Sequence, residues 1–253
     1  MLPEDNILFS IDLMGTLLEF ELPGRTLEDS DFLRGPPVDL RPYVNTLART
    51  EYRYTPPNNR GSCEFFESGW YFYTKKWWEK KNQGMLKLLV SLETPRTDEL
   101  DIFPDLFIEN QLKEWLSIYY RDRQLIKNRT SFSSAESRDI EITFHNEKDA
   151  PVISPEDVPL NKWPEEISGM PCYFIYLNPG IIEFNLPISH RDVLQFRFQL
   201  RYLLDDIKIK QQLNPLALNF SQKLIKTVSI SLSDRETERK NTKPVIPSIK
   251  ADI

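Results

Sequence analysis

The stretch VLQFRFQLRYLL, which begins at Val193, constrains the fold of this chain more than any other segment. Apolar and polar side chains alternate strictly along it from Leu194 to Tyr202. Successive side chains of a β-strand point to opposite faces of its sheet, so this alternation predicts a long strand with one apolar and one polar face. We therefore expect a protein built around a sheet that buries one side of this strand.

Two further pairs of segments predict antiparallel hairpins. The aromatic run CEFFESGWYFYTKKWW and the run GMLKLLVSLE are joined through residues 82–84 (NQG), which favour a turn. The runs CYFIYL and IIEFNLP flank residues 178–180 (NPG), a second turn by composition. We expect both hairpins to belong to mostly antiparallel sheets.

The N-terminal segment ILFSIDLMGTLLEFELP, residues 7–23, alternates in the same way. It predicts a strand that bends or bulges at Gly15 and ends at Pro23. Its last seven residues, LLEFELP, resemble IIEFNLP at residues 181–187. We interpret the similarity as two strands that leave a sheet at a proline, placed either at equivalent positions of one sheet or in two similar halves.

Two segments change to the period of a helix. The spacing i, i+4, i+7, i+8 and i+11 of one helix face is followed by Ile108, Leu112, Trp115, Leu116 and Tyr119. This spacing predicts one long central helix at about residues 105–123. The segment LALNFSQKLIKTVSISL predicts a C-terminal helix at about residues 215–230. The expected fold class is therefore α+β, with mostly antiparallel, twisted sheets.

A proline-rich segment, DAPVISPEDVPLNKWPEE, divides the chain near residue 150. We expect residues 1–150 to form an N-terminal part of sheet and helix, including a short strand at residues 140–144. Residues 151–232 should hold the second hairpin, the long strand and the C-terminal helix, either as one domain with the first part or as another. Residues 233–253 are polar and predict a tail with little core of its own.

The charge of the chain is acidic, with 38 Asp and Glu residues against 32 Lys and Arg residues and a net charge of -6. A nucleic-acid-binding protein needs a basic surface to displace counterions, so we expect no nucleic-acid partner. No run of 18 or more apolar residues occurs, which predicts that no helix spans a membrane. The N-terminus is acidic where a signal peptide is basic, so we expect a cytoplasmic protein unless a signal peptide has already been removed.

The cysteine and histidine content does not indicate a metal site. Cys63 and Cys172 stand far apart, and two thiols without nearby histidines do not make a zinc-finger site. They form one long-range disulfide in an oxidising compartment or remain buried free thiols, the interpretation we favour. His145 and His190, the two histidines, occur in segments typical of solvated loops. We expect no metal and no cofactor.

The segment DLMGTL, which begins at Asp12, is the sharpest candidate for a catalytic site. It resembles the first motif of haloacid-dehalogenase-like hydrolases, in which the aspartate is a nucleophile and a second acid or a tyrosine follows two residues later. Here Met14 occupies that position and cannot transfer a proton. No Gly-Asp-x-x-x-Asp pair follows that would bind magnesium. We therefore expect no enzymatic activity, and a hydrolase that uses Asp12 is the alternative.

The most unusual local composition is GWYFYTKKWWEKK at residues 69–81. Its aromatic residues and lysines suit base stacking with phosphate contacts, a protein interface, or a strand with aromatic side chains in the core and lysines at a protected edge. The acidic charge of the whole chain disfavours the first of these. A binding patch, if one exists here, is expected at Glu64, Glu67, Trp70, Trp77 and Trp78.

Three features occur together: a Gly-Trp strand followed by Trp-Trp, a hairpin that ends in LPISHRD, and the strand VLQFRFQL before a C-terminal helix. With this combination the chain resembles immunity-type proteins of bacterial toxin systems, including those associated with type VI secretion, over residues 173–232 and 68–78. The resemblance implies function by binding, through a rigid mixed sheet that covers the active site or maturation surface of a cognate toxin. It implies no catalytic residues.

We therefore expect a non-enzymatic protein-binding protein that neutralises a toxin by direct protein–protein interaction. A secretion adaptor or chaperone for an effector is the alternative, because such a protein also binds the product of a neighbouring gene. Neither expectation decides whether the chain associates with itself.

Overall fold

The structure is a computed structural model. It describes residues 6–13, 15–23, 53–55, 60–73, 82–136, 159–178, 180–202 and 207–242. The strand predicted at residues 140–144 lies outside the described residues, as do His145, Trp77 and Trp78.

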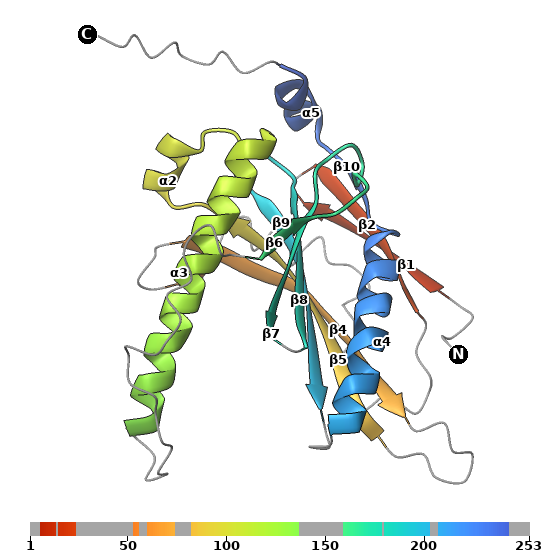
Figure 1. Cartoon of the computed structure of the whole chain (residues 1–253). Helices are drawn as coiled ribbons and strands as arrows, with labels where there is room; N and C mark the ends of the chain where they lie inside the picture. Colours follow the sequence, from red (N-terminus) through yellow and green to blue (C-terminus); the bar gives the residue numbers. More distant parts are fainter. Residues whose placement is uncertain are drawn as a thin grey trace.

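A seven-stranded antiparallel sheet forms the centre of the fold (Figure 1), with the strand order β3-β4-β5-β9-β8-β7-β6. Its strands are β3 Arg53–Thr55, β4 Arg60–Tyr73, β5 Asn82–Thr94, β6 Leu160–Lys162, β7 Tyr173–Asn178, β8 Ile181–Pro187 and β9 Val193–Tyr202. The predicted alternating strand is β9, and the two predicted hairpins are β4–β5 and β7–β8. The turn predicted at residues 82–84 is wrong, because these residues begin β5 and pair with the end of β4. Because β5 pairs with β9, one sheet joins the segments on either side of the proline-rich region.

A smaller antiparallel sheet consists of β1 Asn6–Leu13, β2 Thr16–Pro23 and β10 Ser229–Ser231, in the order β1-β2-β10. The prediction of one bent strand at the N-terminus is wrong, because Gly15 adopts a positive φ of 92° in a turn that folds β2 back onto β1. The backbone N–H of Gly15 donates to Asp12 Oδ1 at 2.7 Å and closes that turn. LLEFELP and IIEFNLP thus belong to β2 and β8, in two different sheets, and they do not pair.

The helices of the described residues are α2 Thr97–Ile102, α3 Glu109–Glu136, α4 Ile207–Ile225 and α5 Asp234–Asn241. The helix predicted at about residues 105–123 is α3, which runs for 28 residues along the outside of the large sheet (Figure 1), so its predicted central position is not confirmed. The C-terminal helix predicted at about residues 215–230 is α4, which begins earlier and ends before β10. The polar tail contains α5, which buries none of its residues.

An apolar core lies between the large sheet, the small sheet and α4. The ring of Phe20 on β2 is fully buried there, with its centroid 5.1 Å from that of Phe66 on β4 and 5.7 Å from that of Phe196 on β9. Edge-to-face contacts of this kind add to the free energy of area burial and hold the two sheets together. Cys63 and Cys172 are free thiols buried in the same core, and burial raises the pKa of Cys172.

We expect the substitution Gly84→Ala to lower the free energy of unfolding by about 1 to 3 kcal/mol. A Cβ atom at residue 84 would lie 2.7 Å from Leu213 Cδ1 on α4 and 2.9 Å from the carbonyl oxygen of Arg201 on β9. Urea denaturation measures the effect, with Ser10→Ala at an exposed position of β1 as the control. An unchanged denaturation midpoint for Gly84→Ala would contradict the close approach of α4 to β5.

Candidate functional site

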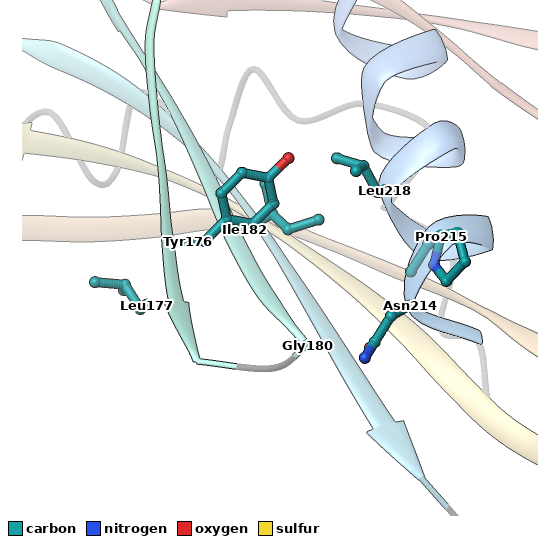
Figure 2. A pocket seen from close by; sticks show the side chains of 8 residues that line it. Tyr176, Leu177, Gly180, Ile182, Asn214, Pro215 and Leu218 are labelled. Carbon is teal, nitrogen blue, oxygen red and sulfur yellow. The ribbon is translucent and has the colours of Figure 1, made fainter. Parts of the chain in front are cut away.

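A cleft of about 640 Å³ opens between the β7–β8 hairpin and α4 (Figure 2). Its walls consist of Tyr176, Leu177, Gly180 and Ile182 from the hairpin and Asn214, Pro215, Ala217 and Leu218 from the helix. Most of these side chains are apolar, and polar side-chain groups enter only from Tyr176 and Asn214. Binding clefts in proteins commonly have this size and this composition.

The hairpin wall of the cleft depends on a glycine and a bulge. Gly180 has a positive φ of 101°, and a Cβ atom there would lie 3.0 Å from the carbonyl oxygen of Leu200. The backbone N–H of Leu200 donates to the carbonyl oxygen of Gly180 at 2.6 Å, which ties the turn to β9. The register shifts between Tyr176 and Asn178, so Leu177 is an extra residue in β7. With this bulge, both Tyr176 and Leu177 line the cleft.

The helix wall follows from the periodicity of α4. Asn214 and Leu218 lie one turn apart on the side of the helix that faces the hairpin (Figure 2). Ile207 stands in line with them at i, i+7 and i+11 spacing, and its side chain is 70% exposed. Pro215 lies inside α4 and has no N–H, so the carbonyl oxygen of Gln211 loses its intrahelical donor. The start of α4 thus presents an exposed apolar side chain, at a position that does not line the cleft.

Asn214 also belongs to a group of polar side chains that lies beside the cleft. The hydroxyl of Tyr202 donates a hydrogen bond to Asn214 Oδ1, and the ammonium nitrogen of Lys210 lies 5.6 Å from the centre of the Tyr202 ring. The sequence of α4 contains three lysines and no acidic side chain. Burial raises the pKa of Tyr176, so its hydroxyl stays protonated and can donate a hydrogen bond.

A second polar cluster is buried between α3 and the face of the large sheet opposite the core. The carboxylate of Glu183 on β8 is fully buried there, and its Oε2 accepts a hydrogen bond from Arg123 Nη1 at 2.8 Å. Arg197 Nε lies 3.1 Å from Glu183 Oε1, although neither of these two atoms completes a hydrogen bond. Burial by itself lowers the pKa of Arg123, but Glu183 and other nearby groups outweigh it and the net shift is upward. The guanidinium group of Arg123 therefore stays charged.

Beside the ion pair, the side chains of Tyr120, Asn185 and Gln195 form hydrogen bonds with one another. Asn185 Nδ2 donates to the hydroxyl of Tyr120 at 2.8 Å, and Gln195 Nε2 donates to Asn185 Oδ1 at 3.1 Å. All three side chains are buried, and burial raises the pKa of Tyr120 well above its ordinary value. Because Tyr120, Asn185 and Gln195 supply hydrogen-bond partners to one another, we interpret them as part of a structural layer that fixes α3 on the sheet.

Glu93 on β5 belongs to the same buried layer. Its Oε1 accepts hydrogen bonds from Ser62 Oγ and Ser91 Oγ, both at 2.8 Å. Burial raises the pKa of this carboxyl group, and the two serine hydrogen bonds oppose the shift only in part. The charged form of Glu93 therefore costs stability in the folded protein.

Three of the five residues predicted as a binding patch lie in the described part of the chain, and they occupy two different faces of β4. Glu64 and Glu67 are exposed on the face of β4 that points away from the core, and Glu67 pairs with Lys87 at 2.8 Å. A bulge just after Glu64 brings both carboxylates to this face despite their odd spacing. Trp70 lies on the opposite face, half-buried, with its ring centroid 4.6 Å from that of Phe220 on α4. None of the three predicted residues lines the cleft.

The residues that line the cleft were missed by the sequence analysis. The common helix face of Ile207, Asn214 and Leu218 is a signal that could have indicated an exposed apolar stripe. The opposite wall could not have been found in this way, because nothing in the sequence indicates which helix packs beside the β7–β8 hairpin.

The remaining catalytic and metal candidates occupy structural positions. Asp12 accepts the turn hydrogen bond from Gly15, and His190 lies at the β8–β9 turn with its Nδ1 3.3 Å from Glu236 Oε2 on α5. Within the described residues, no group of three or more His, Cys, Asp and Glu side chains could hold a metal ion. No helix in the described part of the chain is long and apolar enough to cross a membrane.

No protein-family model, curated protein or solved structure matches this chain. The functional interpretation therefore rests on the geometry of the cleft and on the residues that surround it.

We expect Glu93→Gln to raise stability at neutral and alkaline pH. A carboxyl group whose pKa is raised by folding favours the native state below its ordinary value of 4.5, and this contribution is lost as the pH rises through the raised pKa. Glutamine keeps an acceptor for Ser62 and Ser91 but buries no charge. The melting temperatures of variant and wild type should converge toward pH 4.5 and separate as the pH rises.

The matched control for this measurement is Glu67→Gln, since the side chain of Glu67 is 61% exposed in the neighbouring strand. Its pH profile should follow that of the wild type. A wild-type profile for Glu93→Gln as well would contradict the raised pKa of the buried carboxyl group.

Proposed function

We propose that this chain is a non-enzymatic protein-binding protein that neutralises a cognate bacterial toxin by direct contact, as an immunity protein does. The observation that carries the proposal is the open, mostly apolar cleft between the β7–β8 hairpin and α4. Apolar side chains that line an open cleft are a common feature of binding sites, and they support this proposal. The cleft offers the type of pocket that an anchoring side chain of a partner fills.

Both walls of the cleft, the β7–β8 hairpin and α4, are fixed by contacts with the rest of the protein, and this supports a role in binding. The hairpin turn is hydrogen-bonded to β9 through Gly180, and α4 is anchored in the core by Leu213, Phe220 and Leu224. A site whose walls are already in place loses little conformational entropy when a partner binds. A protein that inhibits by covering another surface needs a binding surface that is already formed before the partner binds.

Co-expression with the product of the adjacent reading frame tests the proposal. The wild-type chain should form a one-to-one complex with that product and protect cells that express it. Leu218→Gln places an amide in the cleft wall and should weaken the complex by about tenfold or more. Leu216→Gln is the matched control, because Leu216 is 52% exposed on another side of the same helix, and it should change the affinity by less than about twofold.

Both variants are first compared with the wild type by thermal denaturation, so that a change in affinity is separated from a change in folding. A wild-type chain that elutes alone, or equal affinities for the two variants, would overturn the proposal. A partner that aggregates without this chain, instead of becoming toxic, would assign the chain to the secretion adaptors or chaperones.

A further inference from the structure

The two sheets of the described residues have four edge strands, and these differ in length. The edge strands β3, β6 and β10 contain three residues each, whereas β1 contains eight. The backbone N–H of Ile230 on β10 also donates to Ser168 Oγ at 2.8 Å, which covers part of that edge. The outer edge of β1 is thus the longest sheet edge in the described part of the chain, and no described strand pairs with it.

A hydrogen bond of β2 shows which backbone groups of β1 point outward. The backbone N–H of Glu21 on β2 donates to Thr227 Oγ1 at 3.0 Å, on the side where β10 lies. The backbone groups of Glu21 therefore point away from Leu8, the residue opposite it on β1. Because these directions alternate along an antiparallel pair, Leu8, Ser10 and Asp12 direct their N–H and C=O groups away from β2, toward the open edge.

The strand β1 lacks the features that usually protect an edge strand. Lysine, proline and bulges at an edge hinder the addition of a further strand. The segment NILFSIDL contains no lysine and no proline, and its register with β2 is regular from end to end. The side chain of Leu8 is 62% exposed beside this edge. A regular row of outward backbone donors and acceptors suits the addition of an extended polypeptide segment.

The charge of the small sheet indicates what kind of segment fits. The strands NILFSIDL, TLLEFELP and SIS contain three acidic residues and no basic residue. Because Ile11 and Leu18 are buried in the core, the alternation of the strands places Asp12 and Glu19 on the opposite face. Glu19 stands opposite Ser10, whose side chain is small. Neighbouring strands lie about 4.8 Å apart, so a long basic side chain on an added strand can reach across Ser10 to the carboxylate of Glu19.

We propose that the outer edge of β1 binds an extended segment of a partner protein in which basic and apolar side chains alternate. The segment adds antiparallel to β1, the more stable form of pairing, and extends the small sheet. Its residues opposite Asp12 and Ser10 are lysine or arginine, and its residue opposite Leu8 is apolar. The side chains between them lie on the face of Phe9 and Ile11 and are apolar as well.

A second copy of this chain is a poorer occupant of the edge. Its own β1 would add another Asp12 to a face that already carries carboxylates, and like charges on neighbouring strands weaken pairing. No residue of β1 lines the cleft between the β7–β8 hairpin and α4. The edge is therefore a separate surface, and this inference does not depend on the proposed function.

Two blocked peptides test the preference with the full chain. The peptide N-acetyl-Lys-Val-Lys-Val-Leu-amide has the proposed pattern, and N-acetyl-Glu-Val-Glu-Val-Leu-amide reverses its charge. In titrations followed by backbone amide NMR, the lysine peptide should shift the resonances of β1. It should bind at least about fivefold more tightly than the glutamate peptide, because opposite charges on neighbouring strands favour pairing.

Methylation of single backbone nitrogens of the lysine peptide tests strand addition itself. In the proposed register the N–H groups of the two lysines and the leucine point to β1, and those of the two valines point away. Methylation at the second lysine should weaken binding by about tenfold or more, because it removes a hydrogen bond and places a methyl group against the edge. Methylation at the second valine should change the affinity by less than about threefold. Equal effects of the two methyl groups would overturn the inference.

Two variants of the protein test the same contacts from the other side. The N–H of Ser10 points away from β2, so Ser10→Pro removes a donor of the open edge and should weaken binding of the lysine peptide by about tenfold or more. Ser10→Ala keeps this N–H and should keep most of the affinity. Glu19→Gln should narrow the difference between the two peptides, while Glu67→Gln, at an exposed position of the large sheet, should not. The methylated peptides replace Ser10→Pro if that variant has a lower melting temperature.

Binding of neither peptide, or equal affinities of the wild type for the two, would overturn this inference. So would a dimer of the free chain in sedimentation that Ser10→Pro dissociates, because a second copy would then occupy the edge. The proposed function is judged separately, by the complex with the adjacent gene product and by the variants of the cleft. Failure of that complex leaves the peptide result standing, and failure of the peptides leaves the complex standing.

Discussion

The pairing of β5 with β9 is the interaction on which the rest of this structure depends. It joins the hairpin that precedes α3 to the hairpin that follows the proline-rich region. Its register also sets both faces of the sheet: Val90 stands opposite Phe196 on the apolar face, and Ser91 stands opposite Gln195 on the polar face. A slip by one residue would exchange these faces and expose the core, so the register is strongly specified.

The two faces of the large sheet then take different neighbours. The small sheet and α4 cover the apolar face, where Phe20 contacts rings from β4 and β9. The polar face carries the buried Glu183 with its arginines, and α3 lies over it. A buried ion pair adds little net stability, but a buried charge that has lost its partner lowers the stability strongly. We therefore interpret this layer as the feature that determines where α3 packs on the sheet.

The cleft results from the way in which the apolar face of the large sheet is covered. Because α4 packs on the apolar face beside the β7–β8 hairpin, the helix and the hairpin turn leave a space that their own side chains do not fill. The aromatic run that suggested a binding patch serves the core in part, through the contact of Trp70 with Phe220. The binding role that we propose therefore rests on α4 and the hairpin, while the patch around Trp77 and Trp78, which lie outside the described residues, stays a prediction.

The sequence by itself determined the elements whose period is strict. The alternation of β9, both hairpins and the helical face of α3 could be predicted because each depends on residues that are close in the chain. The start of α4 could not be predicted from the sequence. Proline is common in the first turn of a helix, so Pro215 suggests that the helix begins there. In the structure the helix begins earlier, and Leu213, which precedes Pro215, packs in the core. Only the tertiary structure decided that LLEFELP and IIEFNLP lie in different sheets, and which hairpin and helix enclose the cleft. These relations depend on contacts between distant segments, which local periodicity does not encode.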